Sequence, residues 1–237
     1  MRVTFLAHDG FLIELNTVCL LFDWWKEPIP PLPDKPLLVF ISHRHEDHFN
    51  PEVFTLAERK ADIQFLLGSD FHLLSRNLEK WRLTPEAAAK CRRCGKHDVF
   101  QPLPAVTVET FPSTDEGVAW MVTAEDKAIF HAGDLNWWHW AEEGDAWNRN
   151  MEVNFKRYTE PLRGRRADLA MLPLDPRLGS GGDLGPDYFL GLMDVRRFFP
   201  MHQWDHFEFT DEFLKRHPQF APITVKIHHN LETFQLN

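Results

Sequence analysis

The sequence has little cysteine, no long basic stretch and no long apolar run. Its three cysteines, in a chain of 237 residues, are too few and odd in number for a disulfide framework, which fits a reducing compartment. No apolar stretch approaches the roughly 20 residues of a membrane-spanning helix. Asp9 and Glu14 interrupt the N-terminal segment, where a secretory signal needs unbroken apolar residues. We therefore expect a cytoplasmic protein with no membrane partner.

The charge balance excludes further partners. The chain has 26 Lys and Arg against 35 Asp and Glu, which gives a net charge of −9. An acidic protein opposes non-specific attraction to a polyanion, and no basic run is present that would form a local basic patch. We expect a small-molecule substrate and no nucleic-acid partner. Composition does not determine the oligomeric state.

The composition, with 43% hydrophobic and 13% aromatic residues, is that of a foldable globular protein. Without a low-complexity tract or a short repeat, we expect a single domain over residues 1–237. Apolar patterns predict strands at residues 11–15, 18–22, 37–41, 106–111, 118–123, 128–130, 169–174, 198–201 and 223–227. Helices are predicted at residues 50–60 and 147–162, from about Pro186, and from an N-cap at Thr210 to about residue 217.

A cluster of histidines follows the predicted strand at residues 37–41. His43, His45, Asp47 and His48 supply four ligand-type side chains within six positions. Alternate residues on an extended loop point the same way, so His43 and His45 can chelate one cation while Asp47 and His48 reach a second. Imidazole nitrogens with a carboxylate oxygen suit zinc, iron or manganese. The alternative is a charged loop with solvated histidines, and we favour the metal site.

This H-x-H-x-D-H pattern resembles the signature of the metallo-β-lactamase superfamily of metal-dependent hydrolases. The resemblance extends to A-H-D-G-F-L-I-E at residues 7–14, H-A-G-D at residues 131–134 and P-M-H at residues 200–202. This order is most similar to the branch that contains L-ascorbate-6-phosphate lactonase. The resemblance implies a four-layer αββα sandwich, with two metals at one edge between its sheets.

The resemblance also implies roles for individual residues. Asp134 would bridge the two metals, and His202 would complete the second site with Asp47 and His48. Two zinc ions are expected, with manganese or iron as alternatives, and a metal-bound hydroxide would attack a small anionic lactone or phosphoester. Oxygen-reducing diiron relatives resemble H-x-E-x-D, so His45 argues against a redox role. Asp47, Asp134 and His8 are the predicted catalytic residues, His8 because it matches a histidine near the metals; the alternative for His8 is a hydrogen-bonded residue at a strand end.

The sequence departs from the family at the first metal. The family usually supplies a third histidine there, but residues 110–117 contain none. Either Asp115 substitutes as an oxygen ligand, or His43, His45, Asp134 and water hold this metal, or the site is weakly occupied; we slightly favour Asp115. The competing hypothesis is therefore a catalytically silent or mononuclear metal-binding protein of the same fold.

Other side chains have two interpretations each. Asp23 either orients a metal-binding histidine by a carboxylate–imidazole hydrogen bond or forms a turn. Arg177 either holds a substrate phosphate or carboxylate or makes a surface salt bridge. Cys91 and Cys94, with His97, resemble half a zinc ribbon, but a surface loop with free thiols is the preferred interpretation. Several tryptophans can form either a wall of the substrate pocket or part of the core: Trp120, Trp137, Trp138, Trp140 and Trp147.

Overall fold

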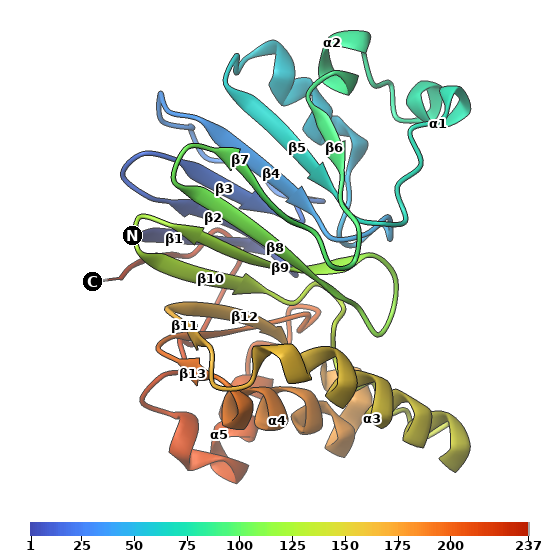
Figure 1. Ribbon diagram of the computed structural model, residues 1–237. Coiled ribbons are helices and arrows are strands. Elements are labelled where there is room, and N and C mark those ends of the chain that lie inside the picture. Colours follow the sequence, from blue (N-terminus) through green and yellow to red (C-terminus); the bar gives the residue numbers. More distant parts are fainter. Residues whose placement is uncertain (237) are drawn as a thin grey trace.

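Two sheets pack face to face in the computed structural model, which describes residues 1–236 (Figure 1). Within that range the first sheet has seven strands, in the order β15 (Thr233–Gln235), β1 (Arg2–Ala7), β2 (Gly10–Glu14), β3 (Cys19–Phe22), β4 (Leu37–Ile41), β5 (Ile63–Leu67) and β6 (Cys91–Arg93). The second sheet has six, in the order β14 (Phe198–Met201), β12 (Leu169–Pro173), β10 (Lys127–His131), β9 (Val118–Ala124), β8 (Val106–Pro112) and β7 (Val99–Leu103). A separate short pair joins β11 (Arg166–Ala167) to β13 (Asp194–Val195).

Helices cover the outer side of each sheet (Figure 1). Beyond the first sheet lie η1 (Pro51–Glu58), α1 (Ser75–Lys80) and α2 (Pro85–Ala88). Beyond the second lie α3 (Asp145–Thr159), η2 (Glu160–Leu162), η3 (Pro176–Asp183), α4 (Leu184–Leu192), α5 (Phe209–Arg216) and η4 (Pro218–Phe220). The arrangement confirms the predicted four-layer αββα sandwich. Across residues 1–236, every helix is too short or too polar to cross a membrane.

Parallel strands bring distant loops to one edge of the sandwich. In the first sheet β3, β4, β5 and β6 run parallel, and in the second β10, β12 and β14 do so. Parallel neighbours are joined by long crossovers and end at the same edge of their sheet. The loop that begins at Ser42 follows β4, the turn to Asp134 follows β10, and His202 follows β14 directly. The residues that follow these strands therefore meet.

The predicted hairpin near the N-terminus is confirmed. Strands β2 and β3 pair antiparallel, with Phe11 opposite Phe22. The turn between them is held from outside the hairpin, because the backbone N–H groups of Asn16 and Thr17 donate to the Glu125 carboxylate over 2.9 and 2.5 Å. A loop of the second sheet thus fixes a turn of the first.

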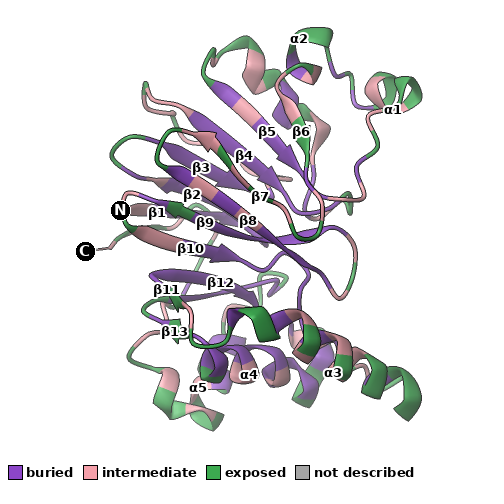
Figure 2. Ribbon diagram, viewed as in Figure 1, coloured by how far each residue is buried: buried purple, intermediate pink, exposed green. Residues whose placement is uncertain are grey.

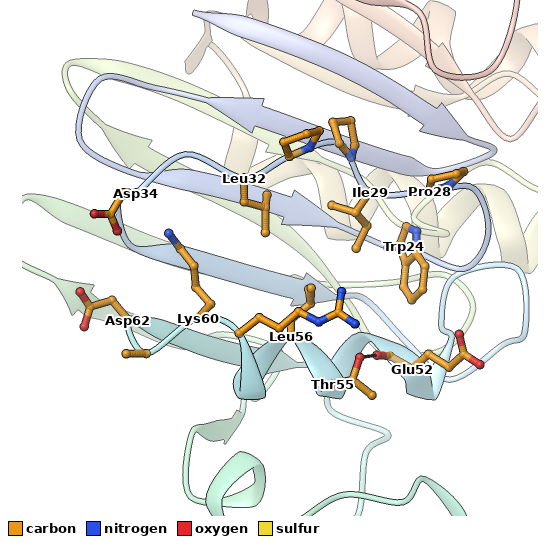
Figure 3. A pocket seen from close by; sticks show the side chains of 14 residues that line it. Trp24, Pro28, Ile29, Leu32, Asp34, Glu52, Thr55, Leu56, Lys60 and Asp62 are labelled. Carbon is orange, nitrogen blue, oxygen red and sulfur yellow. Dashed lines mark hydrogen bonds between the residues drawn. The ribbon is translucent and has the colours of Figure 1, made fainter.

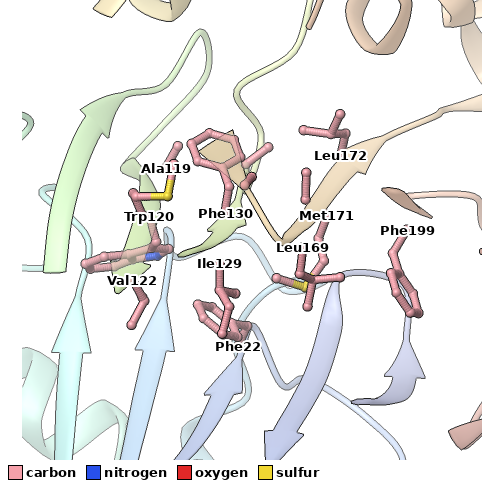
Figure 4. Packing of buried hydrophobic residues seen from close by; sticks show 14 of the residues in the cluster. Phe22, Ala119, Trp120, Val122, Ile129, Phe130, Leu169, Met171, Leu172 and Phe199 are labelled. Carbon is pink, nitrogen blue, oxygen red and sulfur yellow. The ribbon is translucent and has the colours of Figure 1, made fainter. Parts of the chain in front are cut away.

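The larger core lies between the sheets. Phe22 of the first sheet packs there with Trp120, Ile129, Met171 and Phe199 of the second (Figure 4), and all five side chains are buried. Each such side chain contributes about 1.5–3 kcal/mol on burial. Figure 2 shows the strands buried and the outward faces of the helices exposed. A smaller aromatic cluster fills the space between the first sheet and its helices, with Phe49, Phe54, Phe65, Phe71 and Trp81.

Some predicted elements are wrong. Residues 223–227 alternate in polarity but form a single bridge, between Phe198 and Thr224, and the last strand of the described chain is β15. Thr210 is not an N-cap but lies inside α5, and it is buried, so its hydroxyl accepts from the Gln203 amide over 2.9 Å. The segment after Asn50 begins as predicted, with the Asn50 side chain as N-cap, but it forms a 3₁₀ helix.

The cysteine-rich segment is also not a surface loop. Cys91 begins strand β6, at the edge of the first sheet, and is half-buried, whereas Cys94 is fully buried. Burial raises the pKa of each of the two thiols to about 12. Both thiols are therefore protonated near neutral pH and are poor metal ligands.

The proline-rich connection between β3 and β4 lies over η1 and leaves a cavity of about 870 Å³ (Figure 3). Trp24, Ile29 and Leu32 line one side and Leu56 and Lys60 the other (Figure 3). Its described lining includes no histidine. The ligand-type side chains gather elsewhere, at the edge where the parallel strands end.

Candidate metal centre

The loop that carries the H-x-H-x-D-H motif and the turn that carries the H-A-G-D motif pack against each other with almost no space between them. Gly133 adopts a positive φ of 50°, and a Cβ atom built there would lie 2.7 Å from Cβ of Ser42. Glycine is therefore required at this point of the H-A-G-D turn, both for its backbone conformation and for the close approach. The approach brings Asp134, of the second sheet, against the histidine loop of the first.

Asp134 lies at the centre of the cluster. Its Oδ1 is 3.2 Å from Nε2 of His48 and 3.4 Å from Nε2 of His202, and its Oδ2 is 3.4 Å from Nε2 of His43. One carboxylate thus faces two groups of histidines, one with each oxygen. This is the placement expected of a residue between two cations.

One of these groups is deeply buried. It combines His48 and His202 with His8 and Asp9, whose ligand atoms all lie within 4.8 Å of one another. Asp47 joins the group from its open side, with Oδ2 3.4 Å from Nε2 of His8 and 3.9 Å from Nε2 of His202. The structure therefore brings together the residues predicted for the second metal.

The other group is more exposed. Nε2 of His43 lies 2.9 Å from Nδ1 of His45, and that atom of His45 lies 3.9 Å from Oδ2 of Asp115. The side chains of His45 and Asp115 are 45% and 44% exposed, whereas His43 is fully buried. The loop after β8 thus places a carboxylate, Asp115, close to the predicted ligands of the first metal.

Hydrogen bonds to Nδ1 orient three of the histidines. Asp23 and His48 are joined over 2.9 Å, which confirms the predicted carboxylate–imidazole contact. Asp175 makes the same contact with His202, also over 2.9 Å. The Ser42 hydroxyl lies 2.9 Å from Nδ1 of His43 and donates to Asp23. Such partners fix the ring orientation. They leave Nε2 of His48 and His202 without a hydrogen-bond partner in residues 1–236, whereas Nε2 of His43 also contacts Nδ1 of His45.

Several buried ligand atoms have no hydrogen-bond partner anywhere in residues 1–236. They are Nε2 of His8, His48 and His202, Oδ1 of Asp134 and both carboxylate oxygens of Asp9. Buried polar atoms are normally satisfied, so a group of orphaned atoms that converge on one point needs an explanation. Because imidazole nitrogens and carboxylate oxygens are metal donors, a bound cation would satisfy them. The residues present therefore fit a metal centre.

The charged groups of the cluster shift one another's pKa values. Burial alone would lower the pKa of His48 and His202, but the carboxylates of Asp134 and Asp9 raise both. Burial would raise the pKa of Asp134 and Asp47, but the surrounding histidines hold both below the usual range. Metal binding to the protein would consequently displace protons from imidazole rings.

Asp115 behaves differently from the other carboxylates of the site. Burial and the negative charge of Asp134 raise the pKa of Asp115, and the nearby rings of His45 and His43 only partly offset them. The metal-free arrangement is therefore unfavourable for a charged Asp115.

A cavity of about 460 Å³ opens directly over the cluster. Asp47, Asp115, Asp134 and His202 lie on its floor, and its described lining also includes the following residues: His45, Thr114, Trp138, Trp140, Trp147, Met151 and Arg177. The tryptophans thus divide between the two predicted roles. Trp138, Trp140 and Trp147 line the cavity, whereas Trp120 is fully buried in the core and Trp137 packs against Phe155 and Tyr188.

Arg177 makes the predicted salt bridge and also lines the cavity. Its guanidinium forms a short ion pair with Asp175, the partner of His202, and it also lines the cavity. The same group lies 4.6 Å from the ring centre of Trp204 and 5.6 Å from that of Trp140. Arg177 is therefore held in place beside the cluster by a carboxylate and two aromatic rings.

Sequence reasoning missed two side chains of this centre. In the sequence Asp9 stands out only as a break in an apolar segment, although it directly follows His8. Asp175 precedes Arg177 by two positions. The available signal is their position, because each is an aspartate just after a buried strand and beside or near a predicted site residue.

The fold and its relatives define the class of protein, a metal-dependent hydrolase of the metallo-β-lactamase fold. The chain belongs to the family described as "Beta-lactamase superfamily domain", whose model matches residues 2–146. It is 22% identical over 212 residues to a metal-dependent hydrolase of the UPF0173 group from Pyrobaculum aerophilum, which covers 85% of this chain and 84% of that protein.

Two further similarities extend this result. The chain is 34% identical over 95 residues to a putative Rieske 2Fe-2S iron-sulfur protein from Mycolicibacterium smegmatis, but the match covers 34% of this chain and only 18% of that protein. Among solved structures, the metallo hydrolase Igni18 from Ignicoccus hospitalis aligns with a TM-score of 0.65 at 17% identity, over 100% of this chain and 99% of that chain. At this identity the alignment supports the fold.

Proposed function

We propose that the protein is a binuclear metal-dependent hydrolase that acts on a small anionic substrate of the lactone or phosphoester type. The placement of Asp134 carries the proposal, because one carboxylate faces His43 with one oxygen and His48 and His202 with the other. His43, His45, Asp134 and Asp115 would hold the first metal. Asp47, His48, Asp134 and His202 would hold the second.

Zinc is the proposed metal, with manganese or iron as alternatives. When bound, such ions lower the pKa of a bound water to about 7 and polarise a carbonyl or phosphoryl oxygen. The remaining steps belong to side chains. Nε2 of His8 is buried and lies 3.4 Å from Oδ2 of Asp47, which lines the cavity, and His8 would take up or return a proton at that carboxylate.

The cavity supports an anionic substrate with an apolar part. Arg177 is the one cationic side chain in the described lining, and its fixed position allows it to pair with a phosphate or carboxylate. Trp138, Trp140 and Trp147 provide flat apolar surface beside it. The resemblance of the motif order to the branch of L-ascorbate-6-phosphate lactonase favours the same substrate class.

Metal content and hydrolysis together test the proposal. Metal-free protein reconstituted with zinc or manganese should contain two metals per chain by elemental analysis and should hydrolyse generic lactone or phosphodiester substrates. Asp134→Ala should lose both metals together and all activity. Asp187→Ala, a half-exposed aspartate on the far side of the second sheet, is a matched control that should keep both.

The second candidate is a catalytically silent or mononuclear metal-binding protein. The first site favours it, because this site lacks the family's third histidine and because Asp115 and His45 are each nearly half exposed. One metal per chain that excess metal does not change, without hydrolysis of any test substrate, would support this candidate over the binuclear enzyme.

We also propose a single domain, a cytoplasmic location and the absence of nucleic-acid and membrane partners. The acidic net charge of −9 supports the exclusion of nucleic acid. An affinity for RNA or DNA that falls steeply with salt would contradict it.

A further inference from the structure

Asp9 is a buried carboxylate that the ligand set above does not use. It lies in the turn between β1 and β2 with 0% exposure, and neither of its carboxylate oxygens has a hydrogen-bond partner in the described chain. The turn is firmly held. Nε2 of His131 lies 2.9 Å from the Asp9 carbonyl oxygen, and His8 adopts a positive φ of 56° that is uncommon outside glycine. A conformation of this kind persists where the surroundings enforce it, often at a functional site.

The Asp9 carboxylate faces three imidazole rings. Its Oδ2 lies 3.2 Å from Nε2 of His8, 3.4 Å from that of His48 and 3.9 Å from that of His202. His48 and His202 each present Nδ1 to an orienting carboxylate, which leaves a lone pair on Nε2 of the neutral ring. A carboxylate also offers only lone pairs. When these rings are neutral, the electron-pair donors converge where water is excluded, which is the pattern of ligands around a shared cation.

We propose that Asp9 is an additional ligand of the second metal, beside Asp47, His48, Asp134 and His202. This inference rests on the binuclear function proposed above. It gives the second site three carboxylates and two imidazoles. The H-x-H-x-D-H pattern with its later aspartate and histidine would supply only two carboxylates.

The extra carboxylate changes which metal suits the site. Zinc is generally held by four ligands, whereas oxygen-rich sets with more donors suit Mn²⁺ and Fe²⁺. The second site, deeply buried and rich in carboxylates, therefore favours Mn²⁺ or Fe²⁺ relative to zinc. The first site, which contains His43 and His45, keeps a higher share of nitrogen. The two positions of the centre differ in their metal preference for this reason.

A different role for Asp9 would be to orient His8, its nearest imidazole. That role needs one carboxylate oxygen and no approach to His48. In the structure both oxygens are unpartnered within residues 1–236, and Oδ2 is almost as close to His48 as to His8. The position between three rings is that of a shared ligand.

Metal titration of Asp9→Asn separates these roles. Metal-free wild type and variant are titrated with Mn²⁺ and, separately, Zn²⁺ against competing chelators, and both binding equivalents are resolved. The variant should bind the second equivalent of Mn²⁺ at least about tenfold more weakly. Removal of a residue that only hydrogen-bonds to a metal ligand already lowers metal affinity by about that factor. The affinity for the second equivalent of Zn²⁺ should fall by less, and the affinity for the first equivalent of either metal should not change. Asp168→Asn, which removes a buried carboxylate from the opposite end of the second sheet, should change neither affinity.

Unchanged Mn²⁺ affinities in Asp9→Asn would overturn the ligand role. If Asp9 only orients His8, then His8→Gln and Asp9→Asn will shift the pH profile alike and neither will change metal affinity. Stability gives a second readout. A buried carboxylate without a partner destabilises the metal-free protein, so metal-free Asp9→Asn should unfold at a temperature no lower than wild type. A lower temperature or a failure to fold would show a structural role and overturn the proposal.

The experiment gives a different result if the proposed function, and not the role of Asp9, is wrong. If wild type and Asp134→Ala bind the same number of metals, the binuclear centre itself is absent. If wild type binds two metals that Asp134→Ala loses, while Asp9→Asn matches wild type, only the role of Asp9 is wrong.

Discussion

Oδ2 of Asp175 lies 2.9 Å from Nδ1 of His202, and the same carboxylate pairs with Arg177. A single aspartate therefore links a ring of the proposed metal centre to the cationic side chain of the cavity. The burial of Asp175 would raise its pKa, but its contacts with His202 and Arg177 lower it, so the carboxylate is charged at neutral pH. It fixes the tautomer of His202 and the direction of Arg177 together.

Asp175→Asn should therefore affect both metal binding and substrate binding. Loss of the charged partner of a ligating histidine typically lowers metal affinity by about 10–100-fold. Because Arg177 is also released, KM for an anionic substrate should rise even at saturating metal. Chelator competition and steady-state kinetics measure the two effects. Asp211→Asn, which removes an exposed partner of Lys226, is the control that should alter neither. Wild-type metal affinity in Asp175→Asn would contradict the coupling.

Asp115→Ala tests how the first metal is held. If Asp115 replaces the third histidine of the family, the variant should lose one metal per chain and keep the metal held by His48 and His202. Elemental analysis after gel filtration measures the stoichiometry. Glu116→Ala, at the neighbouring half-exposed position, should keep both metals. Two metals held at full strength in Asp115→Ala would exclude this ligand.

Phe130→Ala tests the packing of the second sheet against its helices. Phe130 is fully buried and packs against Phe111 and Phe189. Truncation of such a ring should lower the free energy of unfolding by about 3–5 kcal/mol. Val153→Ala, on the exposed side of α3, should change it by no more than about 0.5 kcal/mol. Denaturant unfolding of metal-free protein measures both, and equal losses would show that the packing between the second sheet and α4 is misassigned.

Asp168 makes stability depend on pH away from the metal centre. Burial would raise its pKa, but donation from the Ala128 N–H and from Arg166 lowers it below 3.8. A carboxyl group with a lowered folded-state pKa stabilises the protein above its unfolded-state pKa, and this contribution is lost as the pH falls through the folded-state value.

The difference in unfolding free energy between wild type and Asp168→Asn should therefore be about 1 kcal/mol near pH 6, allowing for solvent screening at the half-exposed Arg166. It should shrink as the pH falls below 3.8. Urea unfolding at a series of pH values measures it. A difference that does not change with pH would contradict the assignment.

Local sequence information predicted the part of the site that local structure determines. His43, His45, Asp47 and His48 follow one buried strand within a few positions, so the spacing alone indicates a shared function. The distant residues Asp134 and His202 were placed through resemblance to a family, since nothing in their own neighbourhoods shows that β10 and β14 end at the same edge as β4.

The missed features depend on contacts between distant segments. Asp175 is an ordinary strand-end aspartate until His202, 27 positions later, comes into contact with it. Residues 223–227 have the alternation of a strand, but a strand needs a partner along its length, and only Phe198 is available there. The alternation of a sequence shows which face of a segment is apolar. Whether that segment pairs as a strand depends on which other strands the rest of the chain places beside it.

The ligand cluster draws on both ends of the sequence, from His8 in the first turn to His202 after the last parallel strand. During synthesis, a ribosome-bound chain cannot complete the second site before residue 202 has left the exit tunnel. A metal bound between His8 and His202 would therefore be acquired after all the strands that carry its ligands have been synthesised. A metal would bind only to chains in which both sheets have already docked. A truncated or half-folded product would therefore remain metal-free and inert.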